Sequence, residues 1–297
     1  MKRVVFLPYL SAMWASLAPL YEEHKAAGDD VYVMPLYYGI RDTKGHVSTY
    51  RVDNNFPVPT IKPSIEWLKE NHPDTIYFHN PYDEINSVTN IHPSFYSSEL
   101  AKYTDDLVYV PYYSLGIGGN IPRRGYLPGV RHAHRIIVWT YPDRKQHVLD
   151  RVLAQGWEGH ATVKERPEPK RYTEPLEWGL IRKNRKLIML GTSLGALLER
   201  RDEEFDRITK AIMDNQNDIC CLLWRPHPLY DATLYANFPY LRKRYYDMIH
   251  NFIRFRQGIL DESWDVERAV TLCAEYIGDP SSVAEFFLQQ GKPVKYI

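Results

Sequence analysis

Short runs of apolar residues alternate with amphipathic segments along most of the chain. Apolar runs of about four to eight residues between turn residues are typical of buried strands, and apolar residues about 3.6 positions apart are typical of helices. In the first half, the pattern predicts strands at 4–8, 31–37, 75–79, 107–111 and 135–139, and helices at 13–26, 61–70, 96–103 and 144–154. Strands that alternate with helices predict a parallel sheet with right-handed crossovers.

The same alternation begins again after a charged, proline-rich segment at 164–175. Beyond this segment, the pattern predicts strands at 186–190, 219–224, 259–260, 275–277 and 293–297, and helices at 203–214, 240–255, 266–273 and 283–290. We therefore predict an α/β protein of two doubly wound, Rossmann-like domains that face a cleft. The predicted boundaries are 1–163 for the N-terminal domain, 164–185 for a linker and 186–297 for the C-terminal domain.

Composition narrows the class of protein without identifying it. The 297 residues suit two domains of ordinary size, and the 37 basic residues equal the 37 acidic ones. Because no bulk positive charge is present, we expect no nucleic-acid partner. The three cysteines lack metal-ligand spacing, and no HExxH motif occurs, so we expect neither a bound metal nor a cofactor. Free thiols and the lack of a run of about 18 apolar residues predict a cytoplasmic protein.

The segment from Gly278 to Ser282 (GDPSS) leaves a predicted strand and enters a predicted helix. The N-terminus of a helix carries unpaired N–H groups and a partial positive charge, and both suit a phosphate. Asp279, Ser281 and Ser282 are therefore candidate phosphate-binding residues. The alternative interpretation is an ordinary helix that Asp279 caps.

Arg225 and His227 follow the predicted strand at 219–224 and alternate with two prolines. Arginine offers a planar fork to a phosphate, and histidine can donate a hydrogen bond or exchange a proton near neutral pH. Ligands of open α/β sheets bind beyond the carboxyl ends of the strands. We therefore predict that Arg225 binds phosphate and that His227 is catalytic, the alternative being a histidine that bonds only within its own turn.

Two further sets of polar residues end predicted strands. Thr192 and Ser193, within the segment GTSLG, are candidate phosphate ligands, although a simple strand-to-helix turn is the alternative. In the N-terminal domain, His79 and Asp83 follow the third predicted strand and are candidate general bases for a hydroxyl group. A structural histidine is the alternative for His79.

The C-terminal half resembles the CDP-glycerol glycerophosphotransferase family, the teichoic-acid polymerases and primases of GT-B fold. The resemblance rests on Arg225, His227 and Pro228 as an Arg-x-His-Pro turn, and on Asp279, Ser281 and Ser282 followed by Lys292 and Pro293. It covers roughly residues 186–297 and is thinner in the N-terminal half, where no His-Gly pair of the family's catalytic loop occurs. The resemblance implies an acceptor-side N-terminal domain and a donor-binding C-terminal domain.

The implied reaction transfers a glycerol-phosphate-like unit from a CDP-linked donor to an acceptor hydroxyl in the synthesis of a cell-surface polymer. The acceptor would be a glycan or a polyol phosphate, and a lipid-linked acceptor is one alternative. A nucleotide-sugar glycosyltransferase and a catalytically silent nucleotide-binding relative are the other interpretations. The basic and aromatic segment at 240–255 is a candidate for peripheral contact with the inner face of a membrane, or else an ordinary domain helix.

Overall fold

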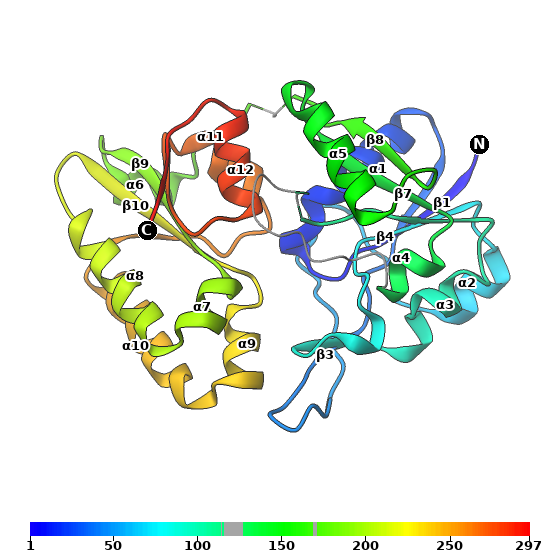
Figure 1. The fold of residues 1–297 in the computed structure, drawn as a ribbon, viewed down its shortest axis with the longest axis horizontal. Helices are drawn as coiled ribbons and strands as arrows, with labels where there is room; N and C mark the ends of the chain where they lie inside the picture. Colours follow the sequence, from blue (N-terminus) through cyan, green and yellow to red (C-terminus); the bar gives the residue numbers. More distant parts are fainter. Residues whose placement is uncertain (114, 116–126, 169–170) are drawn as a thin grey trace. The chain divides into compact units, whose positions relative to one another are not determined.

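The computed structural model describes residues 1–113, 115, 127–168 and 171–297. The chain divides into two compact units, Met1–Pro167 and Glu168–Ile297 (Figure 1). Each unit is built around its own parallel sheet, and each is described below by itself.

The first unit contains a six-stranded parallel sheet in the order β2-β1-β4-β6-β7-β8. Its strands are β1 (Arg3–Leu7), β2 (Asp30–Val33), β4 (Thr75–Phe78), β6 (Asp106–Tyr109), β7 (Arg135–Thr140) and β8 (Ala161–Glu165). The helices are α1 (Ala18–Ala26), α2 (Ile65–Asn71), α3 (Ser97–Leu100), α4 (Pro128–His132) and α5 (Lys145–Gln155). The central strands are buried on both faces, which explains their continuous apolar runs.

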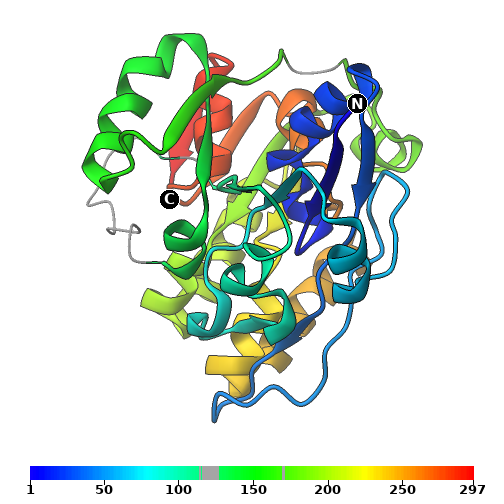
Figure 2. The same ribbon diagram turned by 90° about the vertical axis from the view of Figure 1, so that its right-hand side faces the viewer.

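A short antiparallel ribbon of β3 (Tyr38–Ile40) and β5 (Thr89–Ile91) adds to this unit. The long segment between β3 and α2 contains no helix or strand and runs along the outside of the unit (Figure 2). The sequence predicts a loop there, because polar residues, glycines and prolines dominate residues 39–60.

The helix predicted at 13–26 is divided in two. A 3₁₀ helix covers Ser11–Ser16, and α1 begins only at Ala18. Pro19 explains the break, because proline lacks an N–H and its ring displaces the carbonyl four residues earlier, so it fits only the first turn of an α-helix.

The segment predicted as a linker, 164–185, is partly regular. Strand β8 extends to Glu165 at one edge of the first sheet, and helix α6 covers Leu176–Arg182 in the second unit. The alternation of apolar and polar residues in β8 is short and half exposed, and for this reason the apolar pattern does not reveal it.

The second unit contains a five-stranded parallel sheet in the order β11-β10-β9-β12-β13. Its strands are β9 (Lys186–Thr192), β10 (Cys220–Pro226), β11 (Gly258–Leu260), β12 (Glu275–Gly278) and β13 (Val294–Tyr296). The helices are α6, α7 (Leu194–Arg200), α8 (Asp202–Asp214), α9 (Tyr230–Asn237), α10 (Arg242–Arg254), α11 (Val266–Leu272) and α12 (Ser282–Gln289). The chain proceeds outward from β9 to β11 and then returns to the other side of β9, so the strand order reverses between β9 and β12.

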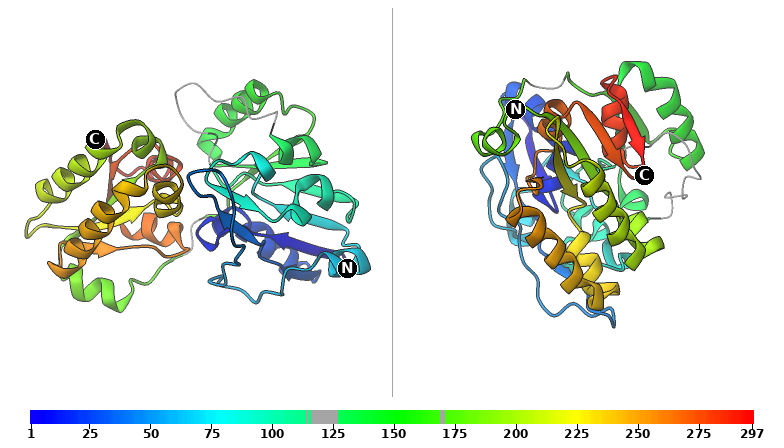
Figure 3. Two further views of the ribbon diagram at one scale, coloured as in Figure 1. Left: turned by 90° about the horizontal axis from the view of Figure 1, so that it is seen from below. Right: turned by 90° about the vertical axis from the view of Figure 1, so that its left-hand side faces the viewer.

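Helices α8 and α10 lie side by side on one face of this sheet (Figure 3). Trp224 of β10 is fully buried beneath them and contacts Tyr245 and Phe252 of α10 edge to face, with ring centroids 6.4 and 5.3 Å apart. Tyr276 of β12 points to the opposite face and packs against Phe287 of α12. The alternation of side chains along each strand therefore supplies two apolar layers.

Helix α10 corresponds to the basic and aromatic segment singled out in the sequence. Its aromatic side chains are divided between the core and the surface, since Tyr245 is buried and Tyr246 is exposed. Its first three cations each pair with an aspartate: Arg242 with Asp231, Lys243 with Asp247 and Arg244 with Asp206. Within the part of the chain that the structure describes, no helix has both the length and the apolar character needed to cross a bilayer.

We expect limited proteolysis to cut the chain first between Glu165 and Leu176. The described residues between β8 and α6 belong to no helix or strand, and backbone outside such elements enters a protease active site most readily. Mass spectrometry of the fragments checks the position. A first cut within β9 or β7 would contradict the division into two separately folded units.

Candidate functional site

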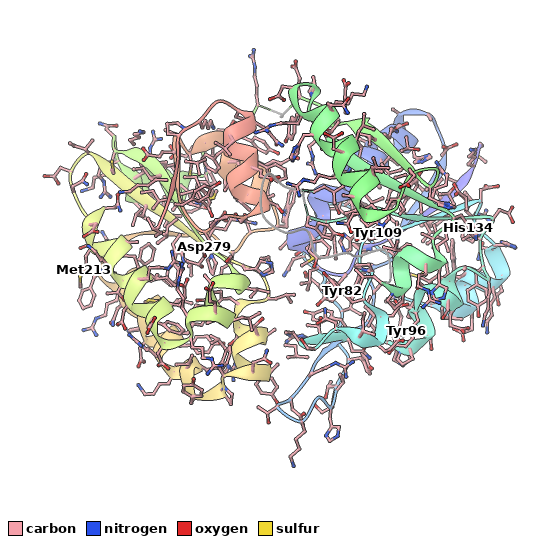
Figure 4. The ribbon with its side chains drawn as sticks, in the orientation of Figure 1. Tyr82, Tyr96, Tyr109, His134, Met213 and Asp279 are labelled. Carbon is pink, nitrogen blue, oxygen red and sulfur yellow. The ribbon has the colours of Figure 1, made fainter. Side chains whose placement is uncertain are left out.

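The carboxyl ends of β9, β10 and β12 meet where the strand order reverses. The His227 N–H donates to the Thr192 carbonyl oxygen at 3.1 Å, and the Ser193 N–H donates to Asp279 Oδ2 at 2.7 Å. The structure therefore brings together five of the residues that the sequence singles out. We call Thr192, Ser193, His227, Asp279 and Ser281 the strand-end site. Asp279 is labelled in Figure 4, between α7 and α12.

Two glycines allow β9 and β12 to approach closely at this site. Gly278 has a φ of 149°, and a Cβ atom there would lie 2.1 Å from the carbonyl oxygen of Gly191. A Cβ atom on Gly191 would in turn meet the ring of Tyr276. Only glycine fits both positions, and the close approach places Asp279 beside the end of β9.

Two serines begin the helices that leave the strand-end site. Ser281 Oγ accepts a hydrogen bond from the Ala284 N–H at 3.2 Å and lies 3.2 Å from the hydroxyl of Tyr276. Ser193 Oγ accepts in the same way from the Ala196 N–H at 3.1 Å. Both hydroxyls therefore act as helix caps. Helix α12 begins at Ser282 and directs the positive end of its dipole toward the carboxyl edge of the sheet.

His227 is held in one tautomer. Its Nδ1 accepts a hydrogen bond from the Leu229 N–H at 3.1 Å, which leaves the proton of the neutral ring on Nε2. Burial, with a smaller contribution from the nearby Arg225 charge, lowers the pKa of His227 to about 4. The ring is therefore neutral at physiological pH and offers an Nε2–H donor, which suits a phosphate oxygen.

Asp279 belongs to a group of charges that is largely buried except for its outer member, Arg200. Arg207 Nη2 is 2.8 Å from Asp279 Oδ1 and 2.5 Å from Glu204 Oε1, and its Nε is 2.8 Å from Glu204 Oε2. Arg200 lies 3.7 Å from both carboxylates. We call Arg200, Glu204, Arg207 and Asp279 the ion cluster. Burial raises the pKa of Glu204, and the hydrogen bond from Arg207 opposes that shift.

The ion cluster changes the role that the sequence suggests for Asp279. Both of its carboxylate oxygens are engaged, one by the Ser193 N–H and the other by Arg207. A buried carboxylate with two partners orients the ends of the strands and is not itself a ligand for another anion. The sequence pattern contains one indication of the cluster, because Glu204 is a charged residue within the apolar stripe of α8 that includes Phe205, Ile208 and Ile212.

The guanidinium of Arg225 is bonded to protein groups after β11. Its Nη1 is 2.5 Å from Asp261 Oδ2, and its Nη2 donates to the Ser263 carbonyl oxygen at 2.7 Å. The side chain is 7% exposed. The fork that the sequence assigns to phosphate is thus held by protein oxygens, and it ties the end of β10 to the segment after β11.

The two candidate bases of the first unit are also engaged by protein groups. His79 is fully buried; its Nε2 accepts from the Tyr9 N–H at 2.8 Å, and its Nδ1 lies 3.1 Å from Ser16 Oγ. Asp83 Oδ2 accepts from the N–H and the hydroxyl of Ser97, at 2.9 and 2.6 Å. These contacts give both side chains a structural role, because both ring nitrogens of His79 and one carboxylate oxygen of Asp83 are engaged by protein groups.

A cavity of about 1350 Å³ runs along the edge strand β11 and includes Asp261 and Ser263, the partners of Arg225. Four basic and four acidic side chains line it, so it has no excess positive charge to attract a phosphate. Among the described residues, no group of three or more His, Cys, Asp or Glu side chains is arranged to hold a metal ion.

No protein-family model and no curated protein matches this chain. Several solved structures resemble it over nearly its whole length. The Methanocaldococcus jannaschii UDP-GlcNAc 2-epimerase, in complex with UDP-GlcNAc and UDP, is 11% identical with a TM-score of 0.55, covering 100% of this chain and 83% of its own. MnaA of S. aureus with UDP is 12% identical with a TM-score of 0.54, covering 99% and 78%.

The wall teichoic acid polymerase TagF is also 12% identical, with a TM-score of 0.54, and covers 99% of this chain and 69% of its own. These structures share a pair of Rossmann-like units of the GT-B type, so the prediction of a two-domain, Rossmann-like α/β fold is confirmed. At this level of identity the likeness establishes the fold and leaves the substrate open.

We expect the His227→Asn variant to lose turnover of a nucleotide-linked donor by about 10²–10³-fold while its melting temperature stays near that of the wild type. Asparagine Oδ1 can still accept from the Leu229 N–H, but the Nε2–H donor is lost. His227→Gln, which places an amide N–H near the Nε2 position, should retain more activity. If the wild type and His227→Asn were equally active, the role of His227 would be limited to accepting the Leu229 N–H within its own turn.

We expect acid to destabilise the fold in part through His79. Burial lowers its pKa from 6.5 to about 3. Between these two pH values, His79 is therefore protonated in the unfolded chain and neutral in the folded chain. This contribution to stability is complete above about pH 6.5 and is lost as the pH falls toward 3. Urea unfolding between pH 7 and 4 should give a shallower pH dependence for His79→Gln, by up to about 1.4 kcal/mol per pH unit. If the free energy of unfolding had the same pH dependence in His79→Gln and the wild type, His79 would not contribute to the loss of stability in acid.

Proposed function

We propose that this chain is a transferase that binds a nucleotide-linked donor at the strand-end site and moves a glycerol-phosphate-like unit from a CDP-linked donor to an acceptor hydroxyl. The observation that carries the proposal is the position of the neutral, oriented ring of His227 beside Thr192 and Ser193 at the reversal of strand order. An open α/β sheet binds its ligand at such a point, and nucleotides are the usual occupants.

In phosphoryl transfer, the protein contributes mainly by positioning the donor and by stabilising charge. The acceptor oxygen attacks the phosphorus of the glycerol-phosphate unit, and the bond from that phosphorus to the oxygen of the CMP leaving group breaks. The leaving oxygen takes the electron pair, and the hydroxyl proton passes to a base. The Nε2–H of His227 and the N-terminus of α12 suit the growing negative charge on CMP.

The proposal assigns no residue as the base. The sequence suggests His79 and Asp83, but both ring nitrogens of His79 contact Tyr9 and Ser16, and one carboxylate oxygen of Asp83 is bonded to Ser97. The acceptor would carry a hydroxyl group on a glycan or a polyol phosphate. The donor half of the reaction is supported more strongly, because its candidate residues lie together in one unit.

A nucleotide-sugar reaction is the second candidate, favoured by two of the similar solved structures, which contain UDP or UDP-GlcNAc. In that case the bond between the sugar carbon and oxygen breaks, and the product is a nucleoside diphosphate instead of CMP. A relative that binds the nucleotide without turnover would share the same donor site.

We expect CDP-glycerol to raise the melting temperature more than UDP-GlcNAc or other CDP-alcohols at equal concentration, because binding to the folded state alone stabilises it. Incubation with the stabilising donor and a polyol-phosphate acceptor should release CMP, measured by chromatography. Release of UDP from UDP-GlcNAc favours the second candidate, and stabilisation without product favours the silent relative. If no nucleotide changes the melting temperature, the proposal that the strand-end site binds a nucleotide-linked donor is contradicted.

A further inference from the structure

Arg200 is the most accessible cation of the ion cluster. It ends α7, the helix that Ser193 begins, and 37% of its side chain is exposed. Its Nη1 lies 3.7 Å from Glu204 Oε2 and 3.7 Å from Asp279 Oδ1. These are ion-pair distances beyond hydrogen-bonding range. Within the described part of the chain, its guanidinium makes no hydrogen bond, so its five N–H donors are free to bind an anion.

Arg207 differs from Arg200 in this respect. It is bonded through two nitrogens to Glu204, it contacts Asp279 at 2.8 Å, and its Nη1 donates to the main-chain oxygen of Ile297 at 2.9 Å. Its side chain is 17% exposed. The inner arginine therefore neutralises and orients the two carboxylates, while the outer arginine is held near them by charge alone.

Tyr230 is bonded to the main chain of His227, and its phenol lies in the electrostatic field of the ion cluster. Its main-chain N–H donates to the His227 carbonyl oxygen at 2.8 Å, and its side chain is 1% exposed. Burial raises the pKa of Tyr230, and the charges of Glu204 and Asp279 raise it further, so the phenol lies within their field. Among the described residues the Tyr230 hydroxyl has no hydrogen-bond partner.

We propose that Arg200 is the side-chain cation that binds the phosphates of the donor, held at the strand-end site by Glu204 and Asp279. This inference rests on the proposed function and adds a residue to it. Arg225, the candidate from the sequence, has its fork bonded to Asp261 and Ser263. Arg200 is attached through α7 to Ser193, so the cation and the end of β9 form one rigid element.

The test is calorimetric titration of the full chain with CDP, UDP and the matching nucleosides, which carry no phosphate. Arg200→Gln should raise the dissociation constants of CDP and UDP by about 10–100-fold, since hydrogen bonds to charged groups contribute to affinity on this scale. The same change should leave the dissociation constants of the nucleosides unaffected. Arg200→Lys should bind CDP and UDP more tightly than Arg200→Gln and less tightly than the wild type. Arg254→Gln removes an arginine from α10 whose guanidinium lies over the ring of Phe255, and it serves as the control.

The outcomes separate this inference from the function on which it rests. An unchanged dissociation constant for CDP and UDP in Arg200→Gln would overturn the role of Arg200 and leave the donor site in place. An equal loss for the nucleosides would overturn it too, because Arg200 would then act through the fold. A wild-type chain that binds neither diphosphate would overturn the donor site itself.

Discussion

The buried carboxylate of Asp279 is the contact on which the geometry of the second unit depends. One of its oxygens accepts the Ser193 N–H, and the other is paired with Arg207. The Asp279 side chain is only 5% exposed, and a carboxylate so buried is stable only with such partners. Removing one partner of a buried pair typically costs about 3–5 kcal/mol. The ends of β9 and β12 are therefore fixed to each other through a charge that cannot turn toward solvent.

This constraint prepares the site before any ligand arrives. The bond from the Ser193 N–H to Asp279 fixes the end of β9 to that of β12, and the bond from the His227 N–H to Thr192 fixes the end of β10 to that of β9. The His227 ring is oriented by the Leu229 N–H and kept neutral by burial. A donor that binds here loses little free energy to ordering the protein, and donors fixed in advance stabilise a developing charge most effectively.

The regular elements of the fold follow closely from the apolar pattern, whereas the roles of polar residues do not. Strands such as β9 and β10 are buried on both faces and appear in the sequence as continuous apolar runs. Strand β8 lies at the edge of its sheet and is half exposed, so it leaves only a weak pattern. Pro19 divides a predicted helix because the spacing of apolar residues contains no information about a missing N–H.

For the candidate site, the sequence predicts which strand ends matter but not which side chains remain available there. Asp279 and Arg225 follow predicted strands and are candidate phosphate ligands in the sequence, yet both are buried and paired with protein groups. Residue type and spacing cannot reveal a partner that is distant in sequence, such as Asp261 for Arg225. A ligand can bind only groups whose hydrogen-bonding capacity the fold has not already used. By this requirement, His227 Nε2 and Arg200 are better candidates for binding a ligand than the buried members of the motifs.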